Sequence, residues 1–409
     1  MTDAGGFKLY RRMTARRTDE PHRVSSPLEL LFDLTFVVAV SKLVVELAHG
    51  IEGGHAVDEV GPFLMVFFAI WWAWMNFTWF ASSYDTDDVP YRMLTMLQMA
   101  GVLVLAAGVP AAFAEGNFTA VTVGYLIMRI GLVAQWLRAG LEHPESRATA
   151  WRYAAGVSVV QLGWIARLAL PEDTGTMSFL ILVALELTVP IWAERTGATF
   201  WHPHHIDERY GLFTIIVLGE SVLAASYGVE SALSAGGVST DLVLVAAAAL
   251  VILFAGWWLY FLEPAGEGLA ANRRRAYLWG YGHFGIFAAL AGLGAGLEVA
   301  VAAAGHHLEV SPVIVGYAVA IPVAVYLILL WGSHAILVAR TRIRPVIILP
   351  AADVVLLLPL VADTVGVTTV VVLIALVCVL VVAVTLADQV RLTRPGRQVA
   401  APGPLPRRG

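Results

Sequence analysis

Residues 366–388 read GVTTVVVLIALVCVLVVAVTLAD, and the only charged residue of this stretch, Asp388, stands at its end. A helix needs about 20 mainly apolar residues to cross the hydrocarbon core of a bilayer, so the stretch predicts a transmembrane helix. The whole chain has the same character, because 58% of its residues are hydrophobic and only 14% are charged. Soluble domains are about 25% charged. The chain is therefore expected to lie in a membrane.

Windows of similar length and apolarity recur along the sequence. The first half has them at 28–49, 61–81, 92–114, 118–138, 151–170 and 177–195, and the second half has them at 208–228, 240–262, 276–298, 312–336, 345–362 and 366–388. We predict an all-α polytopic membrane protein of about 12 transmembrane helices. Residues 1–27 contain no apolar signal region, so the first hydrophobic segment is expected to direct insertion.

Basic residues gather on one side of this predicted topology. The segments on the side of the N-terminus hold Arg92, Arg138, Arg147, Arg152, Arg195, Arg209, Arg273, Arg274, Arg275, Arg340, Arg342, Arg344, Arg391, Arg394, Arg397, Arg407 and Arg408. The loops expected on the other side contain no Lys or Arg. Because positive charge accumulates in cytoplasmic loops, both termini are predicted to be cytoplasmic. The preference for Arg over Lys and the abundance of Ala and Val favour a bacterial origin, and hence the plasma membrane.

Similar words occur in the same order in the two halves. FAIWWAW at 68–74 corresponds to FAGWWLY at 254–260, and two shorter words correspond in the same order. We interpret this as two parallel six-helix repeats, with chance similarity among apolar segments as the alternative. The predicted parts are a basic cytoplasmic N-terminal segment (1–27), a first repeat (28–195), a cytoplasmic His-rich linker (196–207), a second repeat (208–388) and a basic disordered cytoplasmic tail (389–409).

Charged residues inside the predicted helices are the first functional candidates, since each costs about 2.5–3.5 kcal/mol at the centre of a membrane helix. Lys42 and Glu46 lie on one polar stripe of the first helix. Glu220 occupies the position of the second repeat that is equivalent to Lys42. The two are expected to meet as a buried pair, which either lines a central path or only fixes the register of the halves. Asp353 and His283 are further candidates for that path.

Two other groups have structural interpretations. Arg129 and Glu186 lie near the middles of their helices and are expected to form an ion pair. The His-rich linker could in principle bind zinc, but Pro203 interrupts it, so we predict no metal there and expect Asp207 or Glu208 to begin the next helix. The single cysteine, Cys378, is interpreted as packing. No cofactor is expected and no enzyme motif is present.

Two segments resemble a known family. LELLFDLTFVVA at 28–39 and HIDERYGLFTIIVLGES at 205–221 are similar to the two signatures of the bacterial low temperature requirement protein A family, with departures at Leu31 and Tyr210. The resemblance implies a polytopic membrane protein associated by name with growth in the cold, without a settled activity or catalytic residues. Its motif residues here are Glu29, Phe32, Asp33, His205, Glu208, Arg209, Gly219 and Glu220. A weaker, purely architectural likeness exists to a potassium channel family with two six-helix repeats.

The expected function is a transporter or channel for a small polar solute or ion. The alternatives are a non-transporting membrane protein for cold or envelope-stress adaptation and, third, a membrane enzyme that modifies lipid. Membrane lipids are the expected partners, together with the small ion or solute. The net charge of −5 gives no indication of a nucleic-acid partner. The oligomeric state does not follow from the sequence.

Overall fold

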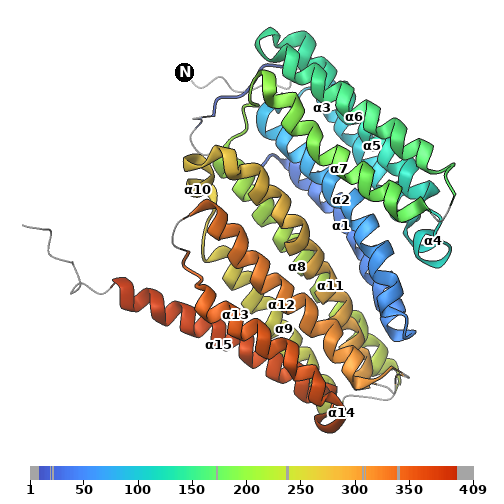
Figure 1. The fold of residues 1–409 in the computed structure, drawn as a ribbon, viewed down its shortest axis with the longest axis vertical. Coiled ribbons are helices and arrows are strands. Elements are labelled where there is room, and N and C mark those ends of the chain that lie inside the picture. Colours follow the sequence, from blue (N-terminus) through green and yellow to red (C-terminus); the bar gives the residue numbers. More distant parts are fainter. Residues whose placement is uncertain are drawn as a thin grey trace, which may run out of the picture.

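The computed structural model describes residues 9–18, 20, 23–171, 174–235, 239–305, 308, 310–338 and 341–393, which form helices and no strand (Figure 1). The long helices of the first half are α1 (Pro27–Glu52), α2 (Ala56–Tyr84), α3 (Val89–Ala107), α5 (Thr119–Glu142), α6 (Arg147–Arg167) and α7 (Gly175–Ala193). Those of the second half are α8 (Pro203–Ala235), α9 (Thr240–Phe261), α11 (Ala276–Gly305), α12 (Pro312–Leu337), α13 (Pro345–Leu357) and α15 (Val367–Thr393). Short helices follow α3, α9 and α13 as α4 (Val109–Ala114), α10 (Gly266–Ala271) and α14 (Ala362–Val365).

Each predicted window coincides with a long helix, but not all of these helices are equally apolar. Within the described residues, 10 helical segments are long and apolar enough to cross a membrane. The long helices outside this set are α1 and α6. Both helices carry polar residues within their length, namely Glu29, Asp33 and Lys42 in α1 and Arg152 and Gln161 in α6. The chain is therefore an all-α, multi-pass membrane protein.

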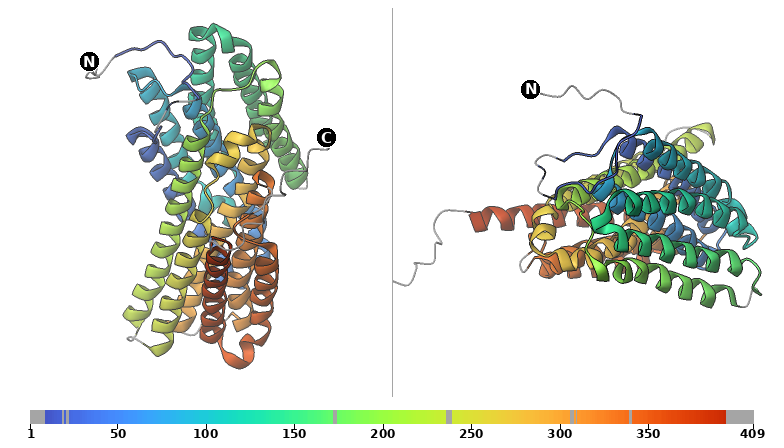
Figure 2. Two further views of the ribbon diagram at one scale, coloured as in Figure 1. Left: turned by 90° about the vertical axis from the view of Figure 1, so that its left-hand side faces the viewer. Right: turned by 90° about the horizontal axis from the view of Figure 1, so that it is seen from above.

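The two halves lie side by side. Helices α1 to α7 form one group and α8 to α15 the other, with α15 at the edge of the second group (Figures 1 and 2). Contacts between α1 and both α8 and α11 join the groups. We call the end of the bundle where α1, α8 and α11 begin the arginine-rich end, because the guanidinium groups of Arg23, Arg138, Arg273 and Arg342 bind helix ends and loops there.

Local sequence explains where the helices at this end begin. Ser26 and Glu29 form a capping box at the start of α1, with Pro27 as the first helical residue. The expectation that α8 begins at Asp207 or Glu208 is wrong, because α8 begins at Pro203. Proline fits the first turn of a helix, where its missing N–H has no helical acceptor. Asp207 instead accepts hydrogen bonds from the backbone N–H groups that precede and begin α10.

The described residues of the N-terminal segment include several that contact the bundle. Met13 is completely buried, and Glu142 at the end of α5 accepts a hydrogen bond from its backbone N–H. Asp88 accepts a hydrogen bond from the N–H of Arg11 and pairs with Arg138 at 2.6 Å. Of the predicted tail, 389–393 continue α15, and 394–409 lie outside the described residues.

Glycines allow neighbouring helices to pack with their backbones in contact. A Cβ atom built on Gly296 of α11 would lie 2.1 Å from the carbonyl oxygen of Ala318 on α12. Small residues at such crossings are the usual means of helix association in a membrane. The α11–α12 contact therefore depends on the absence of a side chain at Gly296.

We expect Gly296→Ala to lower the stability of the purified protein by roughly 1–3 kcal/mol, because the methyl group forces the two helix backbones apart. Thermal unfolding in detergent measures this. The control is Gly332→Ala on α12, where an added Cβ meets nothing within 4 Å. Equal melting temperatures for the two variants would contradict the proposed role of the close contact.

Candidate functional site

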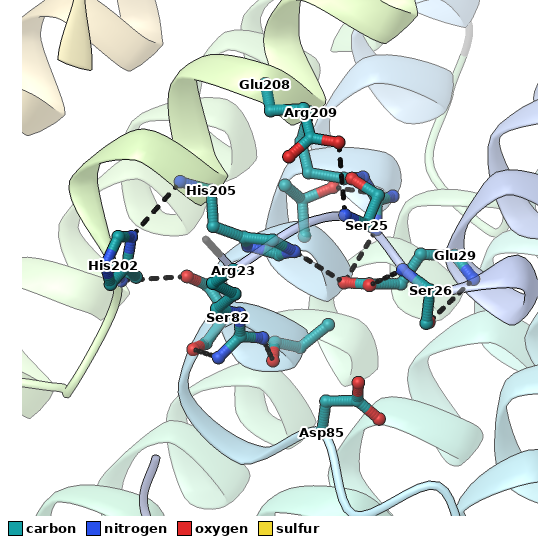
Figure 3. Close-up of polar contacts among 12 residues, drawn as sticks. Arg23, Ser25, Ser26, Glu29, Ser82, Asp85, His202, His205, Glu208 and Arg209 are labelled. Atoms are coloured by element: carbon teal, nitrogen blue, oxygen red, sulfur yellow. Dashed lines mark hydrogen bonds and ion pairs between the residues drawn. The ribbon is translucent and has the colours of Figure 1, made fainter. Parts of the chain in front are cut away.

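A cluster of four charged or titratable side chains lies where α1 and α8 begin (Figure 3). Glu29 and Asp33 come from α1, one helical turn apart, and His205 and Arg209 come from α8 with the same spacing. Residues four apart lie on the same face of a helix. The acidic face of α1 therefore meets the basic face of α8, and all four side chains have 0% exposure.

Arg209 is the centre of this cluster. Its Nη1 lies 2.9 Å from Oε1 of Glu29, as an ion pair without the alignment of a hydrogen bond, and its Nη2 donates to Oδ1 of Asp33. Nε2 of His205 lies 3.2 Å from the same Glu29 oxygen. The Arg209 guanidinium thus forms ion pairs with both carboxylates. Because a charge buried alone would be very costly, the pairing is a condition for burying any of them.

The neighbouring residues of α2 complete the cluster. Trp74 donates its indole N–H to Oδ1 of Asp33 at 2.7 Å, and the hydroxyl of Thr78 lies 3.4 Å from Nη2 of Arg209. Six buried atoms of the four side chains lack a hydrogen-bond partner within the described part of the chain. Oε1 of Glu29, Nε2 of His205 and Nη1 of Arg209 take part in the ion pairs, whereas Oδ2 of Asp33, Nδ1 of His205 and Nε of Arg209 do not.

A second polar layer closes the cluster toward the arginine-rich end. Arg23 donates to the carbonyl oxygens of Ala81 and Ser82 at the end of α2, at 2.8 and 2.7 Å. Glu208 accepts a hydrogen bond from the backbone N–H of Ser25 at 3.1 Å. Burial, together with the negative charge of Glu29, raises the pKa of the Asp85 carboxyl to about 6.

Glu220 and Lys42 do not meet. Glu220 is 3% exposed and faces the interior, where its neighbour on α1 is Ser41. Lys42 is exposed and makes no ion pair with Glu220 within the described chain. Neighbouring residues of a helix point about 100° apart, so the face of α1 that meets Glu220 presents Ser41 and not Lys42. The prediction of a buried Lys42–Glu220 pair is therefore wrong. Glu220 is buried without a cationic partner in the described chain, and its Oε2 has no hydrogen-bond partner there.

The remaining path candidates are dispersed. Glu46 is half-buried and lies near Glu59 of α2. Asp353 is exposed on α13, away from the interior. Gly219 is exposed beside Glu220, whereas Phe32 is buried against Phe77 with ring centroids 4.0 Å apart. Sequence equivalence between repeats does not determine which way a side chain faces.

His283 lies in a cavity of the second half. The cavity has a volume of about 250 Å³, and Asp207, Glu208 and Glu263 contribute carboxylates to its lining. His283 is 1% exposed, and its ring nitrogens lie 3.1 Å from the Tyr260 hydroxyl and 2.9 Å from the carbonyl oxygen of Trp279. In the part of the chain that the structure describes, no three His, Cys, Asp or Glu side chains are grouped to hold a metal ion.

Arg129 and Glu186 lie together in the first half. Their closest atoms, Nη2 and Oε1, are 3.4 Å apart, and both side chains are buried. Glu186 also accepts hydrogen bonds from the Trp72 indole and the Tyr125 hydroxyl, each at 2.8 Å, and from the Trp164 indole at 3.1 Å. A carboxylate with so many donors is held rigidly, which suits a structural role.

Sequence analysis did not identify three features of these sites. Trp74 was noted only as part of a repeated word, and Asp85 and Glu298 were not noted. Glu298 of α11 is partly buried, lies within electrostatic range of Glu220, and also has a carboxylate oxygen without a partner in the described chain. The signal for the cluster itself was in the sequence, because the Glu29–Asp33 and His205–Arg209 pairs have the same spacing and opposite charge.

We expect Arg209→Met to destabilise the protein by about 3–5 kcal/mol, because it leaves two buried carboxylates unpaired. Adding Glu29→Gln and Asp33→Asn to the same variant should recover most of the loss, because the triple variant buries no unpaired charge. Thermal unfolding of the single and triple variants provides the comparison, with Arg152→Met on α6 as a control. Failure of the triple variant to recover stability would show that Arg209 acts otherwise than by charge pairing.

The raised pKa of Asp85 predicts a pH-dependent stability. The folded state binds a proton more tightly than the unfolded state, so the free energy of unfolding should fall as the pH rises from about 4 to about 6, by at most about 3 kcal/mol. Asp85→Asn should abolish this fall. The neighbouring Asp87→Asn should retain it, and denaturant unfolding at several pH values would reveal the difference. An unchanged pH profile in Asp85→Asn would refute the assignment.

Comparisons with known proteins agree with the sequence signatures. The chain is 30% identical over 278 residues to the uncharacterized protein RA0937 of Rhizobium meliloti (strain 1021), which covers 63% of this chain and 65% of that relative. The chain thus spans about two thirds of the relative's length. No solved structure matches it significantly. The profile of the family described as bacterial low temperature requirement A protein (LtrA) matches residues 24–386. The protein therefore belongs to the bacterial low temperature requirement A family.

Proposed function

We propose that this protein moves a small cation across a bacterial plasma membrane. The main support for this proposal is Glu220, a carboxylate that is 3% exposed inside an apolar bundle and has no cationic partner in the described chain. Ionisable groups in such a place are expensive and commonly mark the route of an ion or proton. A carboxylate recognises a cation, so the sign of the transported charge follows from this residue.

The proposed route follows the seam between α1 and α8. At the arginine-rich end, Glu29 and Asp33 are occupied by Arg209. Further toward Glu220, the rings of Trp74 on α2 and Phe213 on α8 pack together, with centroids 4.3 Å apart. Glu220 and Glu298 lie beyond these rings. Opposite charge and aromatic packing thus hold the route closed, and transport would require the α1–α8 seam to rearrange.

The proposed topology has twelve crossings in two parallel six-helix repeats, with both termini in the cytoplasm. Its support is the placement of the long helices, six in each half, and the parallel course of α1 and α8 from the arginine-rich end. The excess of arginine at that end favours a cytoplasmic position for it. In this proposal α1 and α6 also cross the membrane.

A second candidate function has one observation in its favour. The four side chains of the cluster centred on Arg209 are sealed from solvent and pair mainly with one another, as in a purely structural clamp. A non-transporting role in cold or envelope-stress adaptation would use them in this way. The proposal assigns transport and no catalysis to the chain.

Flux measurements in proteoliposomes test the transport proposal. We expect Glu220→Gln to reduce cation flux by at least about tenfold, because the neutral side chain cannot replace the water lost by the cation. Asp353→Asn, which removes an exposed carboxylate, should leave the flux unchanged. The absence of flux through the wild-type protein for every cation in a panel of monovalent and divalent cations would overturn the proposal and favour the second function.

A further inference from the structure

An apolar groove runs along the surface between the two halves. It has a volume of about 360 Å³ and is lined by α2, α7 and α11. Leu64 and Leu180 on its rim are 40% and 56% exposed. All three helices are among the segments apolar enough to cross a membrane, so the groove faces the hydrocarbon core of the bilayer. Water does not fill an apolar groove at this depth, but an acyl chain does.

An arginine stands at one end of this groove. A smaller cavity lined by Arg167 lies next to the groove, because Met65, Phe68 and Phe179 line both spaces. The guanidinium carbon of Arg167 lies 5.7 Å from the centre of the Phe179 ring and 5.4 Å from that of Phe118. Its Nε and Nη2 reach the carbonyl oxygen of Gly175. None of the carboxylates that the structure describes forms an ion pair with it.

The position of Arg167 suits a lipid headgroup. Arg167 ends α6, and Gly175 begins α7, so both lie at the end of the bundle opposite the arginine-rich end. Arginine matches the geometry and charge of a phosphate group. A cation at the edge of the membrane with an apolar groove below it has the charge and shape of one anionic phospholipid.

Trp71 supplies an independent observation. It lines the groove and is 1% exposed, and its indole N–H has no hydrogen-bond partner within the described residues. Buried indole N–H groups usually have an acceptor. Phe179 and Phe68 connect Arg167 to Trp71, with ring centroids 6.0 Å apart between the two phenylalanines and 6.1 Å apart between Phe68 and Trp71. Trp71 lies near the middle of α2 and Arg167 at the end of α6, so the aromatic lining leads from Arg167 toward the centre of the membrane.

We propose that this groove binds one anionic phospholipid, with its phosphate on Arg167 and an acyl chain between α2, α7 and α11. The lipid lies between the halves, where the Tyr281 hydroxyl of α11 donates to the carbonyl oxygen of Leu187 on α7 at 3.1 Å. Its occupancy therefore stabilises the relative position of the halves. The site does not depend on the transport proposal.

Native mass spectrometry of the full-length protein with added phosphatidylglycerol tests the site. The wild type should retain one phosphatidylglycerol more tightly than phosphatidylcholine. Arg167→Gln should weaken that binding about fivefold, the effect of one basic residue near a membrane surface. Gly61→Leu should weaken it from the apolar side, because an added Cβ on Gly61 meets nothing within 4 Å and the new side chain fills the groove without a clash.

Two matched controls separate the site from general effects on the protein. Arg152→Gln removes an arginine of the same helix that lies over Trp192, outside the groove. Gly332→Leu adds a side chain on α12, where an added Cβ also meets nothing within 4 Å. Both should bind phosphatidylglycerol as the wild type does. Equal retention of the two lipids by the wild type, or unchanged retention in both Arg167→Gln and Gly61→Leu, would overturn the proposal.

Discussion

The position of α1 against α8 depends on one permanently charged side chain with no exposed surface. The Arg209 guanidinium stays protonated at any ordinary pH, so its burial requires anions at short range. Glu29 and Asp33 provide them from α1, and this demand fixes both the rotation and the depth of α1 against α8. Hydrophobic packing cannot do this in a membrane, since lipid and apolar side chains are equally good solvents for each other.

The same constraint arranges the rest of the seam. With Arg209 held between Glu29 and Asp33, Trp74 can reach Asp33, and Phe213 is brought against Trp74. The next residues on this face of α8 lead to Glu220. At the arginine-rich end of the seam, both carboxylates are paired with Arg209, whereas Glu220 further along it has no cationic partner in the described chain. This asymmetry separates a clamp from a region with the chemistry to bind a cation.

Lipid-facing features follow a different rule. The groove near Arg167 exists because α7 and α11 belong to different halves and are bridged by Tyr281, with an apolar space beside the bridge. At that place the bilayer acts as a component of the packing. The transport proposal and the lipid site therefore concern different surfaces of the same pair of halves.

Much of this architecture was predictable from local sequence. Hydropathy identified every long helix, since the signal lies within the 20 or so residues of each helix. The Arg129 and Glu186 positions were recognised as exceptions in apolar segments, and the structure brings them together. The Lys42 prediction assumed that equivalent positions in two repeats face the same way. That assumption failed because a shift of one residue rotates a side chain by about 100°.

The sequence by itself determined the membrane environment, the helical segments and the charged words on α1 and α8, because these depend on composition and on residues close together in the chain. Only the tertiary structure decided that Glu29 and Asp33 share Arg209, that Glu220 faces Ser41, and that Arg167 adjoins a groove. Each of these contacts joins helices far apart in the chain. The rotation of each helix about its axis, which is set by packing and by the cost of an unpaired buried charge, selects among the possible partners.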